Sequence, residues 1–197
     1  NKSFKEIKSP NSVHIYEFAE FLKNREKYED AVALYSKVLN QIDNKHFLYA
    51  SASEGRGIAY ERLNQWDKAE TDLLNSLSVS PNQAYVINYL AYSWIEKGLN
   101  INRSLEMLKK ANELKPNDGY IIDSLGWALF KLKNYKEAKK YLEAAIMLMV
   151  SDPVVNDHYA DVLWMNNKNL QARYYWKYVL SLDSTDDELR KKVKEKL

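Results

Sequence analysis

The chain has 197 residues, and its 29 Lys and Arg residues nearly balance its 27 Asp and Glu residues. This balance gives no sign of nucleic acid or an anionic membrane as a partner. The absence of Cys excludes disulfides, thiolate zinc sites and thiol nucleophiles, and no run of about 18 apolar residues is present to span a membrane.

The composition favours helices joined by short turns. Only 5 Gly and 4 Pro interrupt the chain, and 46% of the residues are hydrophobic, which is enough for a sizeable core. The chain begins at Asn1 without a signal peptide. We therefore expect it to be part of a longer protein whose targeting signal, if any, lies upstream.

In chain order, the sequence predicts a loose segment over 1–11, repeats over about 12–45, 50–81, 84–116, 119–150 and 153–183, and a capping helix over 184–197. The basis is a series of small residues that lie 38, 34, 35 and 34 positions apart: Ala19, Gly57, Ala91, Gly126 and Ala160. A period of about 34 residues in helix–turn–helix units is typical of tetratricopeptide repeats. We therefore predict an all-α, right-handed solenoid of five such repeats.

Within each repeat, a second small residue marks where the two helices cross. Ala69 follows Gly57 by twelve positions, and Ala138 follows Gly126 by the same interval. In the third repeat Ser104 follows Ala91 by thirteen, because the turn LNIN is one residue longer.

Polar residues mark helix starts between the repeats and at the end of the array. Asp118 follows Pro116 and can cap the next helix, and Ser184 to Asp187 resembles a capping box. The polar helix that follows, with its basic run LRKKVKEKL, is what a solenoid needs to cover its apolar end.

The candidate binding residues lie on the first helices, which line the concave side of such a stack. Helical spacing from the small residues places one set of side chains in the groove: Tyr85, Asn88, Tyr92, Tyr120, Asp123, Trp127, Phe130, Asp157, Asp161 and Trp164. Clustered Trp and Tyr mark interaction sites, and the acids could accept hydrogen bonds from Lys, Arg or backbone N–H groups of a bound segment. Two alternatives stay open, namely that Trp127 and Phe130 pack in the core and that the acids are solvated helix-face charges.

No catalytic motif is present in the sequence. His14, His46 and His158 fall at different places in the repeat frame, and there is no phosphate-binding glycine loop, G-x-S-x-G or H-E-x-x-H. We therefore predict no enzyme activity, no cofactor and no metal site.

The second half of the chain also resembles a bacterial family of outer-membrane-anchored periplasmic repeat lipoproteins, which includes the adaptor of a carboxyl-terminal processing protease. The matching stretch, from about 82 to 182, contains these elements: NYLAY at 88–92, DSLGW at 123–127, Asp152-Pro153, His158, Leu163-Trp164, Ala172-Arg173 and Trp176. Three features depart from the family. Ala91 and Ala160 stand where Gly is usual, Arg56 occupies an apolar seam position and suggests a looser or differently rotated second hairpin, and the lipid-bearing Cys is missing.

The resemblance implies a periplasmic location, reached through an anchor upstream of Asn1, and a role in bringing a protease together with its protein substrates. The broader expectation is a non-catalytic adaptor that binds a protein or extended peptide. The alternatives are a cytosolic co-chaperone-like module and a purely architectural repeat domain. The acidic groove argues against a carboxylate clamp, which needs Lys and Asn. The oligomeric state stays open.

Overall fold

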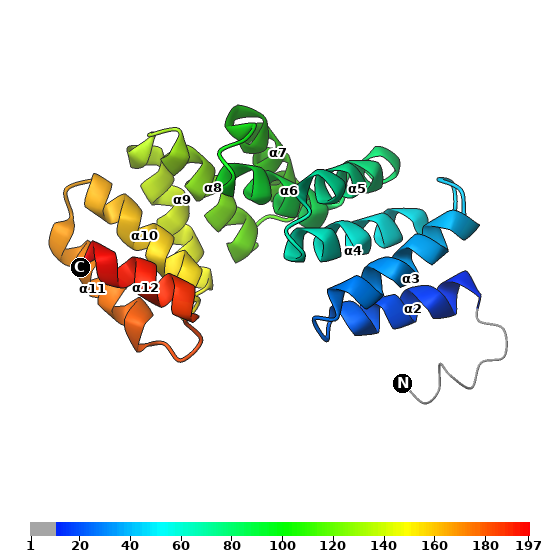
Figure 1. The fold of residues 1–197 in the computed structure, drawn as a ribbon. Coiled ribbons are helices and arrows are strands. Elements are labelled where there is room, and N and C mark those ends of the chain that lie inside the picture. Colours follow the sequence, from blue (N-terminus) through cyan, green and yellow to red (C-terminus); the bar gives the residue numbers. More distant parts are fainter. Residues whose placement is uncertain (1–10) are drawn as a thin grey trace. The chain divides into compact units, whose positions relative to one another are not determined.

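The computed structural model describes residues 11–197, and the helices in this part of the chain account for all of its regular structure (Figure 1). The chain divides into two compact units, Asn1–Val86 and Ile87–Leu197, and each is described by itself. The predicted all-α fold is confirmed. The predicted loose segment lies outside the described residues except for Asn11, whose side chain caps the first described helix.

The first unit contains two helical hairpins. Its helices are α2 (Ser12–Lys23), α3 (Tyr28–Gln41), α4 (Tyr49–Arg62) and α5 (Trp66–Val79). Helix α3 packs on α4, so the two hairpins share a core in which Ile15, Ala19, Ala31, Tyr35 and Ala52 are almost fully buried.

Arg56 in this unit does not loosen its hairpin as the sequence suggested. Its guanidinium donates to both carboxylate oxygens of the buried Asp72 on α5, at 2.6 and 2.8 Å, and to the hydroxyl of Ser36 at 3.1 Å. An ion pair therefore joins α4 to α5 at a seam position where an apolar side chain was expected. Fork-to-carboxylate geometry satisfies both buried groups at once.

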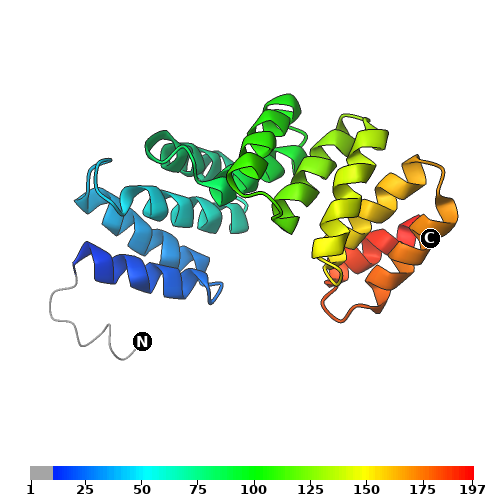
Figure 2. The same ribbon diagram turned by 180° about the vertical axis from the view of Figure 1, so that it is seen from behind.

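The second unit holds the remaining hairpins and the terminal helix. Helix α6 (Ala84–Glu96) begins at the end of the first unit and belongs to the second from Ile87 onward. It is followed by α7 (Ile101–Leu114), α8 (Gly119–Lys131), α9 (Tyr135–Leu148), α10 (Pro153–Met165), α11 (Asn169–Ser181) and α12 (Asp187–Lys196) (Figure 2). The core runs between successive hairpins, with α8 packed on α7, α9 and α10.

Helix starts and turns follow from local chemistry. Asp118 Oδ1 accepts from the backbone N–H groups of Tyr120 and Ile121, and Asp152 caps α10 in the same way. Helix α12 begins differently from the expected capping box, because Asp186 rather than Ser184 accepts from a backbone N–H, that of Leu189. Four of the hairpin turns contain one residue each with φ between 58° and 63°: Glu26, Asn64, Lys133 and Asn167.

Gly126 fixes how closely α8 and α9 approach. A Cβ at this position would lie 2.7 Å from Leu142 Cγ and 3.1 Å from the Leu142 backbone nitrogen. The Leu142 side chain would have to move and its backbone to give slightly, so a side chain at position 126 strains the crossing.

We predict that Gly126→Ala lowers the free energy of unfolding by about 1–2 kcal/mol, because overpacking exceeds the gain in helix propensity. Chemical denaturation measures the change. Gly98→Asn is the comparison, since no heavy atom lies within 4 Å of a Cβ there and any loss comes from its φ of +68° rather than from overpacking. Equal stability of Gly126→Ala and the wild type would contradict the close-approach argument.

Candidate functional site

A pocket of about 290 Å³ opens within the second unit, where one face of α6, α8 and α10 meets α12. Tyr92 and Glu96 come from α6 and Trp127 from α8, while α10, α12 and its N-cap supply the rest of the lining: Val154, Asp157, His158, Asp161, Asp186, Glu188, Leu189, Lys192 and Lys196. Four of the predicted groove residues, Tyr92, Trp127, Asp157 and Asp161, therefore line one cavity.

An aromatic stack forms the floor of this pocket. The Trp127 ring lies between Phe130, with centroids 4.6 Å apart, and His158, with centroids 3.9 Å apart, and both pairs are nearly parallel. The Trp127 indole N–H donates to Glu96 Oε1 at 2.7 Å, and Lys131 Nζ lies 4.7 Å from the ring centroid. The stack joins α8 to α10, and the hydrogen bond ties it to α6.

The expectation that Trp127 presents its face to a ligand is wrong. The side chain is only 7% exposed and belongs to the core cluster with Ala91, Leu108 and Leu125. The physical reason is that the next first helix, α10, places His158 flat against the indole. Phe130 is half-buried, and its ring stacks on Trp127 and packs against the same core.

The side chain of Asp123 is likewise buried and paired within the protein. Its carboxylate lies 2.9 and 3.1 Å from His158 Nδ1, and both side chains are buried. Burial alone would lower the pKa of His158. The charge and hydrogen bond of Asp123, with the charges of Asp157 and Glu96, raise that pKa above its ordinary value. Asp123 therefore does not face a partner, contrary to the groove prediction.

Asp157 and Asp161 form a carboxylate pair that holds an ammonium group. Lys196 Nζ, from the last turn of α12, lies 2.8 and 2.9 Å from the Asp157 oxygens and 2.7 and 2.9 Å from those of Asp161. The Trp176 indole N–H also donates to Asp161, at 3.2 Å. Burial and the nearby Asp157 charge raise the pKa of Asp161, and Lys196 opposes them. The two acids thus share one ammonium group inside the protein rather than being solvated.

The other predicted groove residues lie outside this cavity. Tyr120 is 54% exposed and Trp164 38%, while Asn88 is half-buried and Tyr85, in the first unit, is exposed. By helical spacing, Tyr120 shares a face of α8 with Trp127, and Trp164 shares a face of α10 with Asp157 and Asp161.

Eight of the lining residues were not predicted as site residues, and three of these, Glu96, His158 and Lys196, make polar contacts with the predicted ones. Glu96 follows Tyr92 by four positions, so the helical frame that selected Tyr92 could have found it. Lys196 had no such signal. Its contact spans 35 and 39 positions and depends on how α12 folds back.

A second acidic cluster occupies the first unit. The Tyr35 hydroxyl donates to Glu20, and Lys23 Nζ lies 2.9 Å from the same carboxylate. Burial raises the pKa of Glu54, with Lys23 opposing and Glu20 adding to the shift. Glu20 is thus engaged by Tyr35 and Lys23 within the unit.

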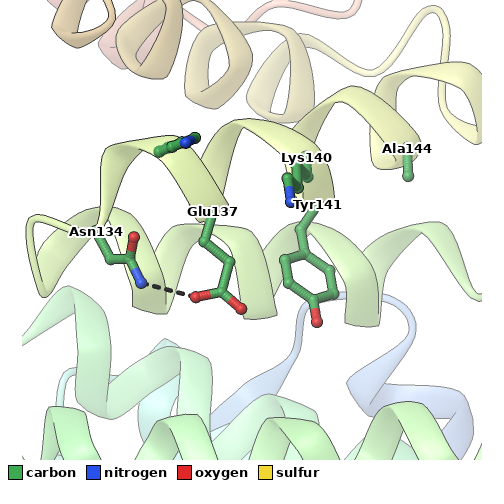
Figure 3. Close-up of a pocket in the computed structure, with 6 residues that line it drawn as sticks. Asn134, Glu137, Lys140, Tyr141 and Ala144 are labelled. Atoms are coloured by element: carbon green, nitrogen blue, oxygen red, sulfur yellow. Dashed lines mark hydrogen bonds between the residues drawn. The ribbon is translucent and has the colours of Figure 1, made fainter.

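A larger hollow of about 540 Å³ lies along α9 (Figure 3). It is lined by Asn134, Lys136, Glu137, Lys140, Tyr141 and Ala144, and Figure 3 shows the hydrogen bond of 2.7 Å from Asn134 to Glu137. All of these residues come from one helix and its N-cap, so no second element closes the hollow into a specific site.

Residues 11–197 contain no cluster of three or more His, Asp or Glu side chains suited to a metal ion. Among the helices in this part of the chain, none has the length and apolar character needed to cross a membrane.

Comparison with known proteins supports a repeat architecture. The sequence profile of the tetratricopeptide repeat matches residues 120–149. The TPR repeat-containing protein PA4667 of Pseudomonas aeruginosa is 28% identical over 129 residues, which is 65% of this chain and 21% of that protein. The BBSome complex member BBS4 of Bos taurus is 28% identical over 118 residues, or 59% of this chain and 21% of its own length. The chain therefore spans about a fifth of each of these relatives.

Solved structures agree on the fold. A structure from the functional characterization of Pseudomonas aeruginosa pilF matches with a TM-score of 0.74 and 19% identity, over 90% of this chain and 79% of that one. The thermophilic TPR protein TTC0263 of Thermus thermophilus matches with a TM-score of 0.72 and 15% identity, over 94% of this chain and 98% of that one. The fold is that of a tetratricopeptide-repeat solenoid, an architecture that typically serves as a non-catalytic scaffold for protein partners.

Because Trp127 is a core residue, we predict that Trp127→Ala lowers the free energy of unfolding by about 3–5 kcal/mol. Thermal and chemical denaturation measure the loss. Tyr120→Ala, an exposed aromatic on the same helix, should change stability by less than about 1 kcal/mol. Similar losses of stability for the two substitutions would contradict the core position of Trp127.

The His158–Asp123 pair should make stability depend on pH. Since folding raises the pKa of His158, protonation favours the folded state. The contribution is complete below the unfolded pKa of about 6.5 and is lost as pH rises through the higher folded value. Denaturation across this range should show stability falling with pH in the wild type. A flatter profile is expected for His158→Gln. Asp123→Asn removes the main interactions that raise the pKa of His158, so burial then dominates and stability should no longer fall as pH rises. Identical profiles for all three proteins would contradict the assignment.

Proposed function

We propose that this chain is the binding region of a bacterial periplasmic adaptor, which holds a segment of a partner protein along one face of α6, α8 and α10. The observation that carries the proposal is the pocket of aromatic and acidic side chains on that face. Tyr120 and Trp164 extend the same helical faces beyond it with exposed rings. Exposed Trp and Tyr near a polar pocket are frequent anchors of protein interfaces.

The partner that fits this face carries positive charge. The pocket is lined by five acidic residues, Glu96, Asp157, Asp161, Asp186 and Glu188, against Lys192 and Lys196, with His158 as a further titratable group. Complementary potentials speed encounter and reject partners of the same sign. The same acidity disfavours the cytosolic co-chaperone alternative, whose clamp binds a carboxylate.

The proposals of a periplasmic location and of a particular partner rest on sequence resemblance. The elements DSLGW and NYLAY resemble the lipoprotein family that includes a protease adaptor, and the relative PA4667 is also a bacterial repeat protein. We propose that the full-length protein is anchored to the outer membrane through a segment upstream of Asn1. In this view it presents substrates to a carboxyl-terminal processing protease. The alternative of a purely architectural domain has one observation in its favour, which is that Lys196 already occupies the pocket.

The test is co-elution of the chain with the carboxyl-terminal processing protease encoded in the same genome, followed by titration. We expect Tyr120→Ala and Trp164→Ala each to weaken binding by about tenfold, the effect of losing an interface hot spot. Tyr174→Ala is the matched control, because this tyrosine is 66% exposed on α11, a second helix of its repeat.

Equal affinities for all three variants would show that the proposed face is not part of the interface. If no complex forms with the protease, that partner is wrong. Fractionation of the full-length protein tests the location separately, and recovery in the cytosol would contradict the anchored periplasmic proposal.

A further inference from the structure

The pocket already holds a ligand-like group, the ammonium of Lys196. The contacts of Lys196 Nζ with Asp157 and Asp161 reach four carboxylate oxygens, all within 2.9 Å. The same nitrogen lies 5.8 Å from the centroid of Trp176. Two carboxylates and an aromatic face are the arrangement that selects a compact cation.

The two acids need a cation at this point. Their side chains are only 10% and 17% exposed, and they lie one helical turn apart on α10. Without a counter-charge, two neighbouring carboxylates would be held together away from water, which strongly disfavours the ionised state. The pair is therefore a preformed receptor for one positive side chain, and Lys196 is its present occupant.

Helix α12 makes a small set of other contacts with the rest of the unit, among them the packing of Leu189 against the core. Val193 is its one fully buried residue, and Arg190 donates to the carbonyl oxygens of Leu180, Leu182 and Thr185 at and just beyond the end of α11. Most of the remaining side chains of α12 are exposed. A ten-residue helix is marginal without packing, so α12 depends on these contacts, and the Lys196 contact is the one that ties its last turn to α10.

We propose that Asp157 and Asp161 bind a lysine or arginine side chain from a basic segment of the partner protein, and that Lys196 is an internal competitor which this segment displaces. This inference rests on the proposed function as a binding scaffold and adds the chemistry of the bound segment and its regulation. The excess of acidic residues in the lining supports a basic occupant, and Tyr92 and Trp176 provide aromatic surface for its aliphatic stem.

Competition within one chain has a measurable consequence. A tethered helix is present at a high effective concentration, so an incoming segment binds only to the fraction of molecules in which α12 is released. Weakening the Lys196 contact should therefore strengthen binding of a basic segment. Removing a receptor carboxylate should abolish binding, whatever the state of α12.

The probe is a synthetic, fluorescently labelled peptide with the sequence of residues 184–197, titrated against the full chain by fluorescence anisotropy. We expect Lys196→Ala to bind it about tenfold more tightly than the wild type does. Lys194→Ala is the matched control, because it removes the same charge from an exposed position of α12 and should behave as the wild type. Adding Asp157→Asn and Asp161→Asn to Lys196→Ala should abolish the gain.

A second peptide, with Lys196→Gln in its sequence, tests whether the cation itself is recognised, and it should bind roughly tenfold more weakly. Amide hydrogen exchange then reports on α12 in the protein, where Lys196→Ala should speed exchange in α12 and leave α8 to α11 unchanged. Equal peptide affinity for the wild type and Lys196→Ala, or faster exchange throughout α8 to α11, would overturn the proposal. Because this assay uses no natural partner, its failure is distinct from failure to bind the protease.

Discussion

The close approach of paired helices at small residues is the constraint on which the repeats depend. At Gly126 the α8 backbone lies so near Leu142 that a single methyl group would clash with its Cγ and press on its backbone nitrogen. Gly57 meets α5 in a similar way, with a Cβ position 3.2 Å from the Ala69 carbonyl oxygen. Once these crossings fix each hairpin, the large side chains of the first helices must point away from the seam. They then either pack against the next repeat or face solvent.

The second unit uses most of that outward face for stacking. Trp127 is covered by His158 from the following repeat, and Asp123 holds the imidazole through its Nδ1 atom. This buried aromatic and ionic contact sets the register between α8 and α10. Binding capacity is left to the parts that the neighbouring repeat does not cover, which are the rim at Tyr120 and Trp164 and the pocket between Tyr92 and α12.

The fold could be predicted from the sequence because its determinants are local and periodic. The small residues recur about every 34 positions, and the caps at Asp118 and Asp152 depend on neighbours within three residues. The candidate site was predicted less well, since helical spacing tells which face Trp127 occupies and not what covers it. His158 lies 31 positions further on, and nothing in the sequence around Trp127 indicates that its ring closes the face. Lys196 was missed for the same reason.

Electrostatic repulsion explains why the acidic side chains, expected to face an open groove, are instead paired within the protein. Three acids on the first helices would repel one another if all faced the same hollow, and the structure relieves this by giving each a partner. Asp123 takes the imidazole of His158, while Asp157 and Asp161 share the ammonium of Lys196. The first of these contacts is buried within the stack, but the second is made by a polar terminal helix with a single fully buried residue, Val193. The two arrangements thus differ in how easily they can be exchanged. His158 cannot leave without dismantling the aromatic stack, whereas another cation can take the place of Lys196 if the last turn of α12 moves away.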